Sequence, residues 1–436
     1  MFKSLQNKIK TFLTRSDYIR DVLTLMTGTV IAQLIPLFFS PVISRIFVPD
    51  DFASFATYMS IISIFGSIAT LRYEYAIILP KDENNSLAIV ALSVIIAFLI
   101  SCLLFLSMIF FGMSFLEIIT NKKIDNSSWL FLIPLSVFTI GVYSSFNYWQ
   151  NRKAHYKTLA VSRISQYALM TGAQIGFGAA LMKSLGLILG EIAGRVCAAF
   201  ILAFRTFKDD FLLIKNIRWK NVTKQFKRYK NFPMFSLPGD LINVFTNQVP
   251  ILALGKYFVP NILGNYFFMD RIMNAPVTLI GKAVLDVFKQ RASSDYIKYG
   301  NCKSVYIKTF KTLVVASSIP TLITFIFAPV LFRIIFGAEW ELAGEFARIM
   351  ALLFFFRLIA SPLSYMFFIA EKQYYDMIWQ VCLFLTTLTS FFAGIYFNSV
   401  KVCLWCYSVS YSVMYIIYLV ISYSLAKGPK IIKSGT

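Results

Sequence analysis

Residues 87–112, LAIVALSVIIAFLISCLLFLSMIFFG, decide the fold class of this chain. The stretch contains no charged side chain. A helix rises about 1.5 Å per residue, so about 20 residues of this kind cross the hydrocarbon core of a bilayer. The stretch therefore predicts a membrane-spanning helix.

The rest of the chain repeats this pattern. Its 436 residues are 58% hydrophobic and only 14% charged, whereas soluble domains average about 25% charged residues. Twelve apolar windows have spanning length, at residues 22–43, 52–79, 87–112, 129–149, 158–182, 186–204, 236–256, 262–286, 312–336, 344–370, 376–397 and 401–426. The short alternating segments of a membrane β-barrel are absent from the sequence. We expect an all-α integral membrane protein with about twelve transmembrane helices.

The charge pattern predicts how the chain is oriented. The net charge is +21, and its Lys and Arg residues concentrate in every second loop, above all in residues 205–235 between the sixth and seventh spans. Basic loops stay on the cytoplasmic side, so both termini are predicted to be cytoplasmic. Attraction to an anionic inner leaflet accounts for the excess charge, and no nucleic-acid partner is expected. Residues 1–21 read as an amphipathic cytoplasmic segment rather than a signal peptide.

A weak internal repeat divides the chain into halves. FVPDDFASF at residues 47–55 matches FVPNILGNY at 258–266, and Phe-Gly recurs at residues 111–112 and 336–337. Six spans per half give both halves the same orientation, so a pseudo-twofold axis normal to the membrane relates them. The expected divisions are the N-terminal segment 1–21, an N-lobe at 22–204, the basic linker 205–235, a C-lobe at 236–426 and a tail at 427–436.

Charged side chains inside the predicted spans are the candidate functional residues. Each costs about 2.5–3.5 kcal/mol at mid-bilayer on insertion scales, so each calls for a partner or an aqueous interior. The candidates for binding a polar or anionic substrate are Arg72, Arg163, Arg195, Arg271, Arg357, Asn243 and Asn247, and the candidate counter-ions or coupling residues are Glu74, Glu191, Asp240 and Asp270. Interhelical hydrogen bonding is the alternative role for the polar residues, and a mutually neutralising i,i+4 pair is the alternative for Glu191 and Arg195.

The segment TLRYEYAIIL at residues 70–79 holds two of these candidates. Residues two apart on a helix point about 200° away from each other. If the second span is helical to residue 79, Arg72 and Glu74 do not pair, and each needs a separate partner. Asp240 likewise has no evident partner in its own span.

No metal or cofactor site is evident in the sequence. The six cysteines form no ligand cluster, and Cys403 and Cys406 lie in an apolar span, where packing explains them. His155 is the one histidine, and no P-loop motif occurs.

The segments GTVIAQLIPLFFSPVISRIFVPDDFASFATY (28–58) and LRYEYAIILPK (71–81) resemble bacterial O-antigen and capsule repeat-unit flippases, the polysaccharide transporters of the multidrug/oligosaccharidyl-lipid/polysaccharide exporter superfamily. The resemblance implies two lobes in the bacterial inner membrane. It implies that alternating access moves an undecaprenyl-pyrophosphate-linked oligosaccharide through a cationic cavity that Arg72 would face. Candidate partners are this substrate, membrane lipids, a coupling H⁺ or Na⁺, and a polysaccharide polymerase with chain-length proteins.

Two alternatives remain open. A multidrug exporter of the same superfamily would favour an acidic cavity, whereas arginines are prominent in these spans. A membrane polymerase or glycosyltransferase would be expected to carry catalytic groups in a large external loop, but the longest predicted external loop, at about residues 113–128, has few ionisable side chains. Arginine suits a pyrophosphate because its planar fork binds two oxygens and keeps its charge.

Overall fold

The computed structural model describes residues 24–120 and 128–428, and every regular element in this part of the chain is helical. The first half contains residues Thr24–Ile46, which end in α2 (Ser40–Ile46), then α3 (Pro49–Ile68), η1 (Tyr73–Ile78), α4 (Glu83–Thr120), η2 (Ser128–Leu132), α5 (Ile133–Arg152), α6 (Tyr156–Ala179), α7 (Lys183–Asp209), α8 (Phe211–Lys215), α9 (Trp219–Arg228) and η3 (Phe232–Ser236). The second half contains α10 (Leu237–Tyr257), α11 (Pro260–Tyr299), α12 (Lys303–Phe336), η4 (Ala338–Trp340), α13 (Glu341–Leu363), α14 (Met366–Ile369), α15 (Gln373–Tyr396) and α16 (Val400–Ala426).

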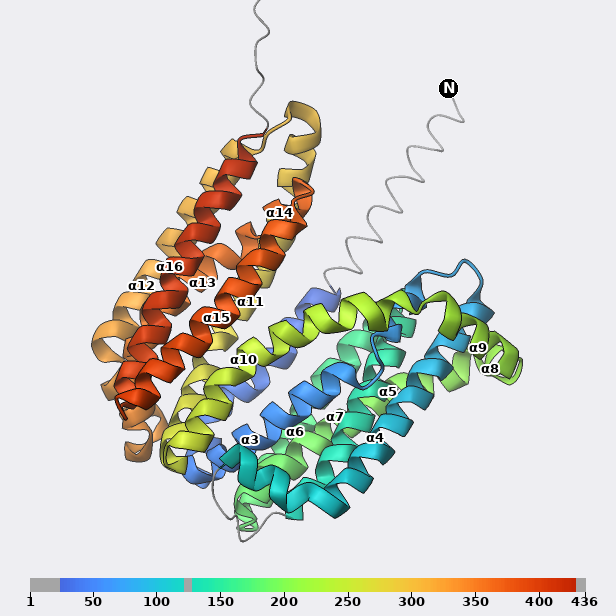
Figure 1. Ribbon diagram of the computed structural model, residues 1–436, viewed down its shortest axis with the longest axis horizontal. Coiled ribbons are helices and arrows are strands. Elements are labelled where there is room, and N and C mark those ends of the chain that lie inside the picture. The colour runs from blue at the N-terminus through green and yellow to red at the C-terminus, as the bar shows by residue number, and fades with distance from the viewer. Residues whose placement is uncertain (1–23, 121–127, 429–436) are drawn as a thin grey trace, which may run out of the picture. The chain divides into compact units, whose positions relative to one another are not determined.

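The helices form two compact units (Figure 1). Among the described residues, unit 1 holds 24–46, 58–118 and 128–241, and unit 2 holds 47–57, 119–120 and 242–428. The first half of α3 therefore belongs to unit 2, and the first turn of α10 belongs to unit 1. The basic segment 205–235 folds as the end of α7, α8, α9 and η3 within unit 1.

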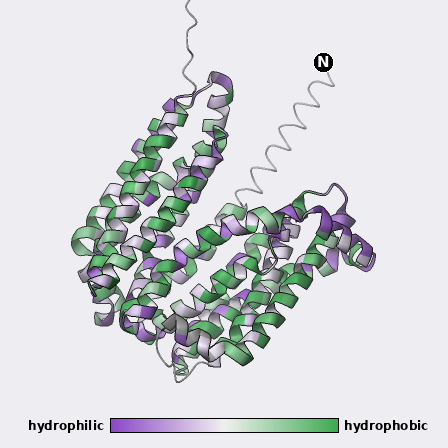
Figure 2. Ribbon diagram, in the orientation of Figure 1, coloured by the Kyte–Doolittle hydropathy of each residue, from purple (hydrophilic) through white to green (hydrophobic). Residues whose placement is uncertain are grey.

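The all-α membrane fold is confirmed. Each of the twelve predicted spans falls on a helix, and nine helices in the described ranges are long and apolar enough to cross a membrane. The other three are α6, α10 and α11, and their hydropathy is lowered by polar residues of the candidate set, such as Arg163, Asp240 and Asp270. Hydrophobic residues run along the long helices, and hydrophilic ones gather at α8 and α9 (Figure 2).

One predicted span has the wrong limits. Residues 52–79 do not form one helix, because α3 ends at Ile68 and the chain reverses through Leu71 and Arg72, which have positive φ angles of 49° and 63°. The segment then continues as the short 3₁₀-helix η1. The expected helical angle between Arg72 and Glu74 therefore does not apply.

The repeat is confirmed at one of its two matches. Pro49 and Pro260 each follow Phe-Val and each begin a long helix. Proline is well tolerated at this position, because the N–H that it lacks would have no partner within the helix. The second match does not correspond in structure, since Gly112 lies inside α4 whereas Gly337 ends α12.

Packing within unit 1 depends on close contact between α6 and α7. A Cβ atom on Gly190 would lie 2.4 Å from the Gln174 side chain, and one on Gly194 would lie 2.5 Å from the Gln166 carbonyl oxygen. These small residues therefore allow the backbones of α6 and α7 to approach closely. In unit 2 the corresponding close-packed centre is aromatic, with the rings of Phe52 and Trp340 packed against Phe268 at centroid distances of 5.3 and 4.1 Å.

We expect Gly190→Ala to destabilise the protein by about 1–3 kcal/mol, because the added methyl has no room between α6 and α7. The thermal midpoint of the detergent-solubilised protein measures the effect. Gly176→Ala on α6 is the matched control, since no atom lies within 4 Å of the point where its added methyl would sit. An equal loss of stability in both variants would contradict the packing argument.

Candidate functional site

The candidate site is built on the turn that joins α3 to η1. Leu71 and Arg72 adopt the left-handed conformation, which costs non-glycine residues about 1–3 kcal/mol and is common at functional sites. The amide of Tyr73 donates to the Thr70 carbonyl oxygen at 3.1 Å and closes the turn. The turn brings the side chains of Arg72 and Glu74 to the same side.

Arg72 is the centre of a charged cluster in unit 1. Its Nη1 lies 3.5 Å from Glu74 Oε1, and its Nε lies 2.9 Å from Asp240 Oδ2. The prediction that Arg72 and Glu74 do not pair is therefore wrong, and so is the description of Asp240 as lacking a partner. The reason is the break in α3, which removes the 200° separation that a helix would impose.

Neighbouring hydroxyl groups hold both carboxylates. Thr70 donates a short hydrogen bond to Glu74 Oε2, and the Tyr75 hydroxyl donates to Asp240 Oδ2 at 3.4 Å. The Arg72 guanidinium also lies over the Tyr75 ring, 5.3 Å from its centroid, where a cation is attracted to the π face. Only 5% of the Glu74 side chain is exposed, compared with 38% for Asp240, so Asp240 is the more solvated of the two partners.

A polar cavity of about 290 Å³ lies beside this cluster within unit 1. Arg72 and Glu74 line it from the turn, and Arg195 lines it from α7. The other lining residues come from α3 and α5: Ile62, Ser63, Gly66, Ser67, Ile140 and Ser144. Two arginines and a row of serine hydroxyls thus face one space, an arrangement suited to phosphate and sugar oxygens.

Arg195 enters this cavity already paired. Its Nε lies 2.7 Å from Glu191 Oε1, one turn earlier on α7, which confirms the predicted i,i+4 pair. Glu191 is buried, while 23% of the Arg195 side chain remains exposed. Arg195 therefore lines the cavity while its Nε is held by Glu191.

The segment that carries Arg72 is anchored from outside the cavity. Arg152, at the end of α5, donates to the carbonyl oxygens of Ile78 at 2.8 Å, Lys81 at 3.3 Å and Ile77 at 3.4 Å. On the other flank Tyr73 stacks on Phe226 of α9 and donates to its carbonyl oxygen at 3.0 Å. These contacts fix η1, and with it the Arg72 turn.

Lys153 forms a second anchor beside Arg152. Its Nζ lies 2.9 Å from Glu83 Oε1 and 3.2 Å from Asp210 Oδ1, and Asp210 also accepts from the Trp149 indole at 2.8 Å. Burial by itself would lower the pKa of Lys153, but the hydrogen bonds and charges of Glu83 and Asp210 outweigh it and raise the pKa. Lys153 therefore stays cationic and joins α5 to α4 and α7.

Unit 2 holds a separate polar cluster around Arg357. This side chain, on α13, lies in the electrostatic field of Asp270 on α11 and of the hydroxyls of Tyr407, Tyr411 and Tyr415 on α16. Asp270 Oδ1 accepts a hydrogen bond of 2.6 Å from Asn274. Three tyrosines and one carboxylate thus act on Arg357.

The remaining candidates lie apart from these clusters. Arg163 donates to Thr29 Oγ1 at 2.6 Å within unit 1, and Arg271, half-buried on α11, has an interaction partner of its own. Asn247 donates to the Asn243 carbonyl oxygen at 2.9 Å within α10. Asn243 donates to Gln380 Oε1 of α15 at 3.5 Å, which fits the alternative role in interhelical hydrogen bonding for Asn243 alone. Across the described ranges no group of three or more metal-ligating side chains occurs.

Sequence reasoning missed several members of the site. No pattern in the sequence marks Thr70, Tyr75 or Arg152 as part of the site, because their roles depend on the turn after α3. The tyrosines of α16 recur at four-residue spacing, and that periodicity could have identified them as one helix face.

Comparison with known families decides the assignment. A family model described as "Polysaccharide biosynthesis protein" matches residues 42–345, well over half of the chain. The chain belongs to this family. The match begins before the Arg72 turn and ends within α13, so it includes the whole unit 1 cavity. Comparison with the sequences of curated proteins gives no match.

Two solved structures share the fold of this chain. The structure of the lipid II flippase MurJ in an inward closed conformation aligns with a TM-score of 0.69 at 14% identity, covering 93% of this chain and 87% of that one. An inward-facing multidrug resistance MATE family transporter of the MOP superfamily aligns at 0.68 and 12% identity, covering 92% and 93%. The resemblance is thus confirmed for the family, which is the polysaccharide biosynthesis family, and for the fold, which is shared with MurJ and MATE structures.

We expect Arg152→Ala to loosen the Arg72 turn without unfolding unit 1. One hydrogen bond from a charged donor contributes about 1.5–3 kcal/mol, so amides of residues 73–81 should exchange with solvent roughly tenfold faster or more. Hydrogen–deuterium exchange of the solubilised protein measures this. Lys157→Ala, an exposed basic residue nearby on α6, is the control. Unchanged exchange in Arg152→Ala would show that other contacts hold the turn.

Proposed function

We propose that this protein translocates lipid-linked oligosaccharides across the bacterial inner membrane, and that the unit 1 cavity binds the pyrophosphate of the substrate. The observation that carries the proposal is the presence of two arginines, Arg72 and Arg195, at one polar cavity within membrane-spanning helices. Membership of a polysaccharide biosynthesis family and a fold shared with a lipid II flippase support it.

The finer assignment follows the resemblance in the sequence. The substrate we propose is an undecaprenyl-pyrophosphate-linked repeat unit for O-antigen or capsule, moved by alternating access with both termini in the cytoplasm. H⁺ or Na⁺ would drive the cycle, and a polymerase with chain-length proteins would take the product. The Arg357 cluster and the asparagines of α10 in unit 2 are the proposed contacts for the glycan, since phenol and amide groups suit sugar hydroxyls.

Binding in unit 1 is proposed to be an exchange of anions. In the present state both arginines are paired with carboxylates, so a pyrophosphate must replace at least one of them. Asp240 is the partner to be displaced, because it is more exposed than Glu74 and lacks the threonine bond that holds Glu74. Removal of Asp240 leaves Arg72 able to offer its fork to two phosphate oxygens.

The main test is neutralisation of the cavity arginines. Arg72→Gln and Arg195→Gln should each lower the export of surface glycan about tenfold or more, since a charge-assisted hydrogen bond contributes about 1.5–3 kcal/mol. Arg72→Lys should restore export only in part, because it keeps the charge but not the fork. Glycan is measured in cells that depend on the variant gene.

Arg205→Gln is the matched control, as Arg205 lies on α7 with its own partner, Asp209, and does not line the cavity. All variants are compared at equal membrane levels and equal thermal stability. Normal export by Arg72→Gln and Arg195→Gln would refute the proposed pyrophosphate site.

A second test concerns the exchange. Asp240→Asn removes the competing negative charge, so the protein should bind a short-chain polyprenyl pyrophosphate severalfold more tightly than the wild type does. Asn243→Asp, one turn away on α10, adds a charge without touching Arg72 and serves as a contrast. Equal affinity of Asp240→Asn and wild type would show that Asp240 does not compete for the site.

The carboxylates support one alternative. Glu74, Glu191 and Asp240 outnumber the two arginines that they contact, and an acidic site suits cationic drugs. In a multidrug exporter Arg72→Gln would keep or raise resistance to cationic compounds, while Glu74→Gln would abolish it. A drug-resistance assay in a sensitive strain therefore separates the two functions.

A further inference from the structure

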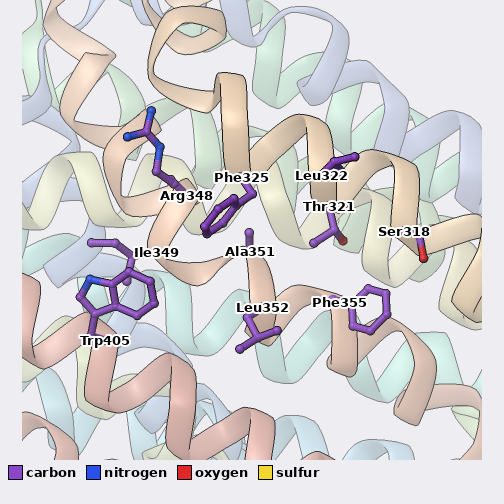
Figure 3. A pocket seen from close by; sticks show the side chains of 10 residues that line it. All are labelled: Ser318, Thr321, Leu322, Phe325, Arg348, Ile349, Ala351, Leu352, Phe355 and Trp405. Carbon is purple, nitrogen blue, oxygen red and sulfur yellow. The ribbon is translucent and has the colours of Figure 1, made fainter.

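A long apolar groove runs along unit 2 between α12 and α16, with α13 as its floor. One part has a volume of about 640 Å³ and is lined by side chains of all three helices, among them Lys311 and Val314 of α12, Phe355 of α13, and Leu419 and Tyr423 of α16. A second part, of about 360 Å³, continues from Phe355 toward Arg348 and Trp405 (Figure 3). Both parts share Phe355, so they follow one another along the same three helices.

The groove opens on side chains that a bilayer would cover. Val315, Ile319 and Leu322 on α12 are 60–68% exposed, next to the lining positions Val314 and Thr321. From Lys311 to Phe325 a helix extends about 20 Å, and one leaflet of the hydrocarbon core is about 15 Å thick. The groove therefore has the length and the polarity for an acyl chain.

Two cations lie at one end of this apolar space. Lys311 lines the groove itself, and Lys427 stacks on the lining residue Tyr423 with its Nζ 4.5 Å from the ring centroid. Tyr306 on α12 is tied to α16, because its hydroxyl donates to the carbonyl oxygen of Leu419 at 3.1 Å and lies 2.7 Å from Ser422 Oγ. A chain lying in the groove would thus place its headgroup beside two ammonium groups.

We propose that this groove binds an anionic membrane phospholipid. Its phosphate pairs with Lys311 and Lys427, and one acyl chain lies along α13 past Phe355. Charge complementarity favours an anionic headgroup, because its phosphate can pair with the two lysines. In a zwitterionic lipid the headgroup's own cation already neutralises the phosphate. The proposal concerns unit 2 alone and does not depend on the proposed transport function.

The test uses the purified full-length protein in detergent, titrated with phosphatidylglycerol or phosphatidylcholine of identical chains and followed by native mass spectrometry. Phosphatidylglycerol should bind more tightly than phosphatidylcholine does. Lys311→Gln and Lys427→Gln should each lower the affinity for phosphatidylglycerol about fivefold. Lys308→Gln, on α12 but outside the groove, should leave affinity unchanged. Equal binding of the two lipids, or equal loss in the control, would overturn the proposal.

Blocking the groove gives an independent result. Val314→Trp fills the space and should abolish the site, whereas Val315→Trp, on the neighbouring exposed position, should not. Equal lipid binding by these two variants would overturn the proposal; if Val314→Trp does not fold, the lysine variants decide.

Undecaprenyl phosphate is added as a competitor in a separate experiment. If it binds more tightly than phosphatidylglycerol does, the groove belongs to a polyprenyl tail and the proposal is contradicted.

Discussion

The pairing of Arg72 with Glu74 and Asp240 is the constraint on which the architecture of unit 1 depends. A charged side chain within membrane-spanning structure needs a partner, and Arg72 meets two because α3 stops at Ile68. The turn that makes this possible uses two left-handed residues without glycine. Such a conformation persists only where surrounding contacts enforce it, and Arg152 and Tyr73 supply those contacts from two sides.

The sequence predicted the fold well because hydropathy is a local property. Each apolar window overlaps a helix of the structure. The pairing of Glu191 with Arg195 was also predicted, because the two residues lie one turn apart on α7. The break after Ile68 was missed because TLRYEYAIIL contains neither glycine nor proline, and its apolar residues are as compatible with helix as with 3₁₀ structure. Its causes lie far away in sequence, in Arg152 and Asp240, and a single sequence does not show such contacts.

The two units treat their half-buried arginines differently, although a long helix begins with Phe-Val-Pro in each half of the sequence. Arg72 and Arg195 are held by carboxylates at 2.9 and 2.7 Å, whereas Arg357 lies among tyrosines of α16 near Asp270. The internal repeat is therefore a property of the backbone and not of the polar residues. Consequently the site residues of one half could not be transferred to the other by the repeat alone.

Stability does not account for the charged residues around the cavity. Replacing a buried ion pair by apolar side chains of similar size is often neutral or stabilising, because the desolvation of both charges offsets their attraction. Leu or Met at positions 191 and 195 would also favour membrane insertion of α7. Three charged side chains nevertheless line one small cavity, and Asp240 and Glu191 pair with two of them. This placement is what an exchange of ionic partners requires, because an arginine held by a removable carboxylate stays solvated and correctly oriented until another anion takes its place.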